Sequence, residues 1–142
     1  MAYTEELLEG SLKPLGTAML TADDLSSAAV HGEYVAMARV KVKRIMAYVS
    51  IVTVGASTIE VNRRPLAGSA TGEVVVGTIV IPAGTAAGKL VYKDIDPVAI
   101  NAGEGLSFEV LAAATSGSAH YGFDADHAPQ DARENTDMIA SA

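Results

Sequence analysis

The chain has 142 residues, of which 49% are apolar, and its 17 acidic residues outnumber its 10 lysines and arginines to give a formal net charge of −7. That length suffices for one substantial core and is short for two, so we expect a single domain. The negative charge argues against a protein that grips the phosphate backbone of nucleic acid. The absence of cysteine excludes disulfides, thiolate catalysis and cysteine-based zinc sites.

The N-terminal residues show no export or membrane signal. Met1 to Glu6 have neither the basic segment nor the apolar core of a signal peptide. No apolar run in the chain reaches the roughly 20 residues that a membrane helix needs. We therefore expect a soluble protein that is made in the cytoplasm and has no membrane partner.

The first part of the chain is predicted to be an arm followed by loops. Thr4 to Glu9 can form one or two helical turns, with the Thr4 side chain as the N-cap. Turn residues follow at Lys13–Gly16, so residues 1–16 are predicted to lie outside the main core. The polar run Asp23–Ser27 is predicted to be a second loop.

The first strong strand signal begins at Val35. Apolar residues there alternate with Arg39, Lys41 and Lys43, as in a strand with one buried face. The alternation continues to Val54, which predicts one long strand or two strands joined by a bend near Lys43. Both faces become apolar toward Val54, so this segment belongs inside a sandwich.

Four more strand candidates follow at regular intervals, separated by glycine and proline. They are Thr58–Arg63, Glu73–Ile81, Lys89–Asp94 and Leu106–Ala112. Short strands with a turn every ten or so residues are typical of a β-sandwich or barrel. We therefore predict an all-β sandwich over residues 17–129 and a flexible C-terminal tail over residues 130–142.

The segment from Gly117 to Ala128 carries the most tempting metal ligands. Alternation along a strand would place His120, Asp124 and Asp126 on one face, and imidazole and carboxylate groups suit zinc or iron. A polar loop ending at Pro129 explains the same residues, and no further convergent ligand can be placed. We therefore predict no metal site.

No catalytic motif is present either. The chain lacks a Gly-x-Ser-x-Gly elbow and a phosphate-binding loop. A cupin-like enzyme would need a metal ringed by histidines, and the three histidines, His31, His120 and His127, are too few and too dispersed. We predict a protein that is not an enzyme and binds no cofactor.

Two groups of side chains are candidates for protein contacts. They are the basic residues Arg39, Lys41, Lys43, Arg63 and Arg64, and the apolar arm residues Tyr3, Leu7 and Leu8. The basic residues could meet an acidic partner, or could form a solvated face that discourages edge pairing. The arm residues could pack on their own domain or reach across an interface.

Residues 77–110, GTIVIPAGTAAGKLVYKDIDPVAINAGEGLSFEV, resemble a segment of small head proteins of tailed bacteriophages, the capsid cement or decoration proteins. The resemblance covers the middle part of the chain closely and the rest more loosely, and the family has no catalytic motif to compare. It implies a jelly-roll-like fold that lies as a dimer or trimer on the outside of the capsid. The implied partner is the major capsid protein.

The resemblance therefore predicts a structural virion protein that cements neighbouring capsid subunits. A binding module, such as a head-fibre base or a carbohydrate-binding β-sandwich, is the alternative. The composition weakens the carbohydrate-binding alternative, because two phenylalanines, five tyrosines and no tryptophan provide few aromatic platforms for a sugar ring.

Overall fold

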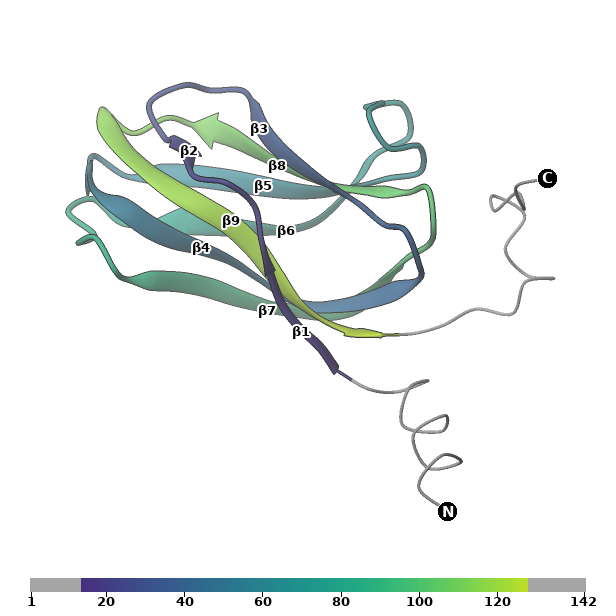
Figure 1. The fold of residues 1–142 in the computed structure, drawn as a ribbon. Coiled ribbons are helices and arrows are strands. Elements are labelled where there is room, and N and C mark those ends of the chain that lie inside the picture. Colours follow the sequence, from purple (N-terminus) through teal and green to yellow (C-terminus); the bar gives the residue numbers. More distant parts are fainter. Residues whose placement is uncertain (1–13, 128–142) are drawn as a thin grey trace, which may run out of the picture.

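The computed structural model describes residues 14–127, which form two antiparallel β-sheets packed face to face. Sheet A runs from edge to edge through β1 (Pro14–Met19), β9 (Ser116–His127), β4 (Val40–Val54) and β7 (Leu90–Ile100), and the short β2 (Asp23–Asp24) also pairs with β9. Sheet B contains β3 (Val30–Val35), β8 (Gly105–Ala112), β5 (Ser57–Arg64) and β6 (Val74–Ile81). Figure 1 shows the two layers. The predicted all-β sandwich is confirmed.

The chain changes layer at most connections, so strands that are distant in sequence lie side by side. The order is β1-β9-β4-β7 in sheet A and β3-β8-β5-β6 in sheet B. Among the strands of residues 14–127, only β5 and β6 are consecutive and also pair with each other. Apart from the short β2, the two layers have four strands each, and four-strand layers interleaved in this way are a jelly roll, as the sequence resemblance implied.

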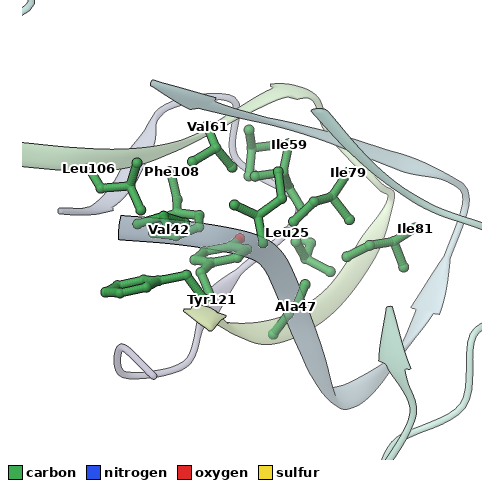
Figure 2. Close-up of a cluster of buried hydrophobic side chains, with 14 of the residues drawn as sticks. Leu25, Val42, Ala47, Ile59, Val61, Ile79, Ile81, Leu106, Phe108 and Tyr121 are labelled. Carbon is green, nitrogen blue, oxygen red and sulfur yellow. The ribbon is translucent and has the colours of Figure 1, made fainter. Parts of the chain in front are cut away.

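The core lies between the sheets and is built by alternate residues of the strands (Figure 2). Val42, Ile45 and Val49 of β4 have no exposed surface. Phe108 of β8 and Tyr121 of β9 stack from opposite layers, with ring centroids 5.7 Å apart. The aromatic contact joins sheet B to sheet A at the centre of the sandwich.

β4 is one continuous strand of 15 residues with a bulge near its start. Its register against both β7 and β9 shifts between Val42 and Arg44. Val42 and Ile45 both face the core, so Lys43 and Arg44 lie together on the outer side, as an extra residue in a strand requires. The predicted bend near Lys43 is therefore a bulge within a single strand.

The predicted start of this strand was wrong. Val35 is the last residue of β3 in sheet B, and β4 begins at Val40 in sheet A. Residues 36–39 connect the two layers, and the backbones of Ala36 and Gly103 are hydrogen-bonded there, at 2.9 Å. Alternation of side chains along the sequence does not show where the chain leaves one sheet for the other.

Three segments predicted to be turns or loops are strands of sheet A. Pro14–Gly16 begins β1, Asp23–Asp24 forms β2, and the polar segment from Gly117 belongs to β9. β1 and β2 both pair with β9, at the far end of the described chain. Their strand structure comes from this distant partner, which local composition does not reveal.

β7 is longer than predicted and runs through Pro97 to Ile100. A proline inside a strand is compatible with this position because β7 is an edge strand of sheet A. The predicted helical turns at Thr4–Glu9 and the predicted tail at 130–142 lie outside the described residues. Within residues 14–127, no helix is long and apolar enough to cross a membrane.

Candidate functional site: a groove on the outer face of sheet A

A groove with a volume of about 430 Å³ crosses the outer face of sheet A. Four strands contribute to it: β1, β4, β7 and β9. Its lining side chains are Met19, Arg44, Met46, Tyr48, Leu90, His120 and Asp124. We refer to this site as the sheet-A groove.

The strand register arranges these side chains in rows across the sheet. Tyr48 of β4 is paired with His120 of β9 on one side and with Leu90 of β7 on the other. Arg44 is paired in the same way with Asp124 and Asp94. Cross-strand pairs of this kind hold their side chains close together on one face.

The floor of the groove lies between these rows. Met46 has 2% of its surface exposed but stands apart from the core cluster between the sheets. Its register partner Gly122 is also paired with Met19 of β1, so no side chain fills the position between the two methionines. Because Gly122 has no side chain, the outer face is hollow at this point. The flexible side chains of Met19 and Met46 line the hollow.

The exposed side chains of Tyr48 and Leu90 form the walls, and Tyr92 lies next to the groove, where it is paired in register with Met46. Tyr48, Leu90 and Tyr92 are 40%, 50% and 56% exposed. The Tyr48 ring lies 6.1 Å from the ring of His120, between centroids. The Arg44 guanidinium lies 4.5 Å from the centroid of the Tyr92 ring, which is cation–π geometry.

Ion pairs form a charged rim at one end of the groove. Arg44 donates to Asp94 at 2.6 Å and lies 3.9 Å from Asp124. Lys43 pairs with Asp126 at 3.0 Å. The hydrogen bond to Asp94 raises the pKa of Arg44, which keeps its positive charge in place at any physiological pH. The cations of the rim are thus neutralised by neighbours from β7 and β9.

His120 and Asp124, which the sequence analysis considered and rejected as metal ligands, do share the outer face of β9, and both line the groove. The Nδ1 atom of His120 donates to the Leu20 carbonyl at 2.9 Å, which orients the ring. Within the described part of the chain, no group of three or more His, Asp or Glu side chains could hold a metal ion. The alternative explanation of these residues as a polar loop was wrong, because they belong to a central strand.

The predicted contact residues separate into different environments. Lys41 and Lys43 are exposed on β4, whereas Arg39 precedes that strand and is partly buried. Arg63 pairs with Glu104 at 2.7 Å, and Arg64 is only 8% exposed. Arg63 and Arg64 therefore stabilise the fold through interactions within the chain, and they are not part of the candidate site.

The arm residues Tyr3, Leu7 and Leu8 lie outside the described residues. The groove walls Tyr48 and Leu90 and the adjacent Tyr92 were not predicted as contact residues. The sequence does carry one signal for Tyr48, because continued alternation along this strand places Tyr48 on the face opposite Ala47 and Val49.

No known protein family matches the sequence, and no curated protein matches it. One similar solved structure contains the CBM22-1 and GH10 modules of endo-1,4-beta-D-xylanase 10B from Clostridium thermocellum, complexed with xylohexaose. It is 15% identical with a TM-score of 0.40, and the similarity covers 86% of this chain and 26% of that chain. At this level the similarity assigns neither a family nor a ligand.

Proposed function

We propose that the protein is a non-enzymatic structural protein that binds the outside of a tailed-phage capsid and cements neighbouring major capsid protein subunits. The observation that carries the proposal is the apolar and aromatic strip on the outer face of sheet A. The strip consists of the exposed side chains Met19, Tyr48, Leu90 and Tyr92. Apolar patches with a polar rim mark interaction sites on soluble proteins. The resemblance of residues 77–110 to capsid decoration proteins supplies the class of partner.

The composition of this face suits a protein partner. Interface centres are enriched in tyrosine, methionine and arginine, and charged groups gather at the rim. Here Tyr48 and Met46 lie in the middle, and Arg44 with Asp94 lies at one end. Because the rim charges are already paired within the chain, they need no partner charge to compensate them on docking.

The same face does not suit nucleic acid. The cations Lys43 and Arg44 stand among Asp94, Asp124 and Asp126, so the face presents no surplus of positive charge to phosphates. We therefore propose that the protein acts on the virion surface through protein contacts alone, with the contact area summed over many identical copies.

Co-sedimentation with capsid shells that lack the protein tests the proposal. A Tyr48→Ser, Leu90→Ser double variant removes two walls of the groove and should lose shell binding. A Leu66→Ser variant is the matched control, because Leu66 is 65% exposed but lies in the loop after β5. Failure of the wild-type protein to bind shells would reject the proposed function, and equal binding by the double variant would reject the proposed face.

A carbohydrate-binding role is the second candidate, and one observation favours it. Tyr48 lines the groove together with the polar groups of His120 and Asp124, and the exposed Tyr92 lies next to it on β7. Sugars bind where rings and polar groups converge. Arg44 already covers one face of the Tyr92 ring, which reduces the surface left for stacking. Affinity electrophoresis in a panel of soluble polysaccharides tests this role, with the Tyr48→Ser variant as the comparison.

A further inference from the structure

The outer face of sheet B carries two glutamates directly opposite each other. Glu60 of β5 and Glu109 of β8 are register partners, and β5 and β8 are the two inner strands of this sheet (Figure 1). Val61 and Phe108, the next register pair, are buried in the core, so both glutamates point to the outer face. Like charges at directly opposed positions destabilise a sheet, so the pair costs stability unless a positive charge compensates it.

No side chain within residues 14–127 supplies that positive charge. The ion pairs of this part of the chain involve neither Glu60 nor Glu109. The residues that flank them on the neighbouring strands, Thr78 of β6 and Val30 of β3, are uncharged. Arg64, on the same face of β5, already lies between two carboxylates of its own. Both glutamates are half-buried, so water and salt screen their repulsion incompletely.

A buried hydroxyl group lies beside the two glutamates. Ser107 of β8 and Asn62 of β5 are register partners two residues along from them, and strand alternation places all four side chains on the outer face. Ser107 has no exposed surface, and its Oγ atom has no hydrogen-bond partner within the described residues. A buried hydroxyl without a partner costs stability, and a ligand bound at this face would supply the partner.

The register places the four side chains within reach of one another. The Asn62 amide donates to Oε1 of Glu60 at 3.1 Å, which turns this carboxylate towards Ser107, the register partner of Asn62. Directly opposed Cβ atoms lie about 4.5–5.5 Å apart and diagonal ones about 7–8 Å, distances that glutamate side chains span. The group offers carboxylate, amide and hydroxyl oxygens and no imidazole or thiolate. Oxygen ligands of this kind suit Ca²⁺, which accepts flexible geometry and completes its shell with water.

We propose that Glu60, Glu109, Asn62 and Ser107 form a Ca²⁺ site on the outer face of sheet B. The ion bridges β5 to β8, replaces the repulsion between the two carboxylates by attraction, and gives the Ser107 hydroxyl a partner. Within residues 14–127 no third acidic or histidine side chain completes the site, so we expect weak affinity, in the range of roughly 10⁻⁴–10⁻³ M.

This site is distinct from the sheet-A groove. Its ligands lie on the other sheet from the β9 residues that were considered and rejected as metal ligands. The Ca²⁺ site goes beyond the proposed capsid function and does not depend on it. Its tests use no capsid shells, so their failure leaves the capsid proposal unaffected.

The first test is thermal melting of the full chain after removal of metal ions with a chelator. Circular dichroism follows the melting at constant ionic strength, kept with NaCl. The wild-type Tm should rise as CaCl₂ increases from about 0.1 mM to about 10 mM, because an ion that binds only the folded state stabilises it. MgCl₂ should raise the Tm less, since Mg²⁺ gives up its water reluctantly. An unchanged Tm, or an equal rise with both ions, would overturn the proposal.

The second test separates a cation site from a purely structural role. Without Ca²⁺, Glu109→Gln should melt no lower than the wild type, because it removes the repulsion with Glu60. Ser107→Ala should also melt no lower, because it removes an unpartnered hydroxyl. In CaCl₂ both variants should melt below the wild type. Stabilising contacts within the chain would instead be lost in both conditions.

Calorimetric titration with CaCl₂ measures the affinity of the same variants. Glu109→Gln should bind at least about tenfold more weakly, because even the outer partners of metal ligands contribute that much. Asp96→Asn is the matched control: it removes the same charge from an exposed position on β7 and should bind Ca²⁺ like the wild type. Equal binding by Glu109→Gln and the wild type would show that Ca²⁺ does not bind at these glutamates and would overturn the proposal.

Discussion

Arg44 and Arg64 belong to two basic clusters that look alike in sequence, and each arginine lies between two carboxylates. Arg64 contacts Glu33 at 3.3 Å and Glu73 at 3.1 Å, while Arg44 contacts Asp94 and Asp124. The difference is burial: the Arg64 side chain is 10% exposed and the Arg44 side chain 40%. Pairing alone therefore does not tell a structural cation from one on a binding surface.

The surroundings of Arg64 show what the buried cluster does. Glu33 of β3 also accepts the backbone N–H of Gly68 at 2.8 Å, and Gly68 has a positive φ of 83°. One carboxylate thus ties β3, the end of β5 and the following turn together. Arg44 instead leans over the exposed ring of Tyr92, where a partner could reach it.

Arg64→Met should cause the largest loss of stability. It leaves Glu33 and Glu73 without their cation at 18% and 25% side-chain exposure. Breaking a buried pair from one side costs about 3–5 kcal/mol, and we expect the lower end because both acids retain some solvent. Urea unfolding measures the loss. If Arg44→Met destabilised the protein equally, burial would not separate the two clusters.

His31 is a further buried cation, but unlike Arg64 it can lose its charge near neutral pH. Its side chain is 7% exposed, and both ring nitrogens face acceptors, the Asp23 carboxylate at 2.9 Å and the Ser27 carbonyl. Two acceptors favour the doubly protonated ring. Burial is the largest influence and lowers the pKa of His31, but the hydrogen bonds to Ser27 and Asp23 and the nearby charge of Asp24 together raise it above 6.5.

A folded-state pKa above the ordinary value means that this contact stabilises the protein fully below pH 6.5 and is lost as the pH rises through the folded-state pKa. Unfolding of the wild type and of His31→Gln, measured between about pH 5 and about pH 9, should show a difference that shrinks with rising pH. A constant difference would show that His31 does not carry the effect.

Arg44→Met should have the smallest effect on stability, because water screens exposed ion pairs. We expect its urea midpoint to stay close to that of the wild type. Its capsid binding should nevertheless weaken, since the variant removes both the ion pair with Asp94 and the contact with Tyr92. Unchanged binding would place the docking surface away from this end of the groove.

The strands that the sequence predicted best are those with a local signal. β5 and β8 begin and end within one residue of the predicted ranges, because apolar and polar residue types alternate along both segments of the sequence and turns flank them. β9 was harder to predict: Tyr121 and Phe123 face the core, but its outer residues His120 and Asp124 are polar. A central strand that lines a polar-rimmed groove resembles a loop in composition.

The groove itself could not be predicted in the same way. It depends on the pairing of Met46 with Gly122, and of Gly122 with Met19, across three strands from different parts of the chain. The bulge at Lys43 shifts the alternation of β4 by one residue, and this shift determines which of the later β4 side chains face outward. Such registers come from tertiary pairing, whereas residue types along one strand predict only which face is buried.

The position of β9 also governs the order in which the sandwich can be assembled. All four strands of sheet B have been synthesised once the chain reaches Ala112, whereas sheet A lacks the strand that separates β1 from β4 until residues 116–127 are made. During synthesis, sheet B can therefore form completely before the last strand of sheet A has been made. Pairing across such long separations is slow, so closure of sheet A by its last strand is expected to limit the rate of folding.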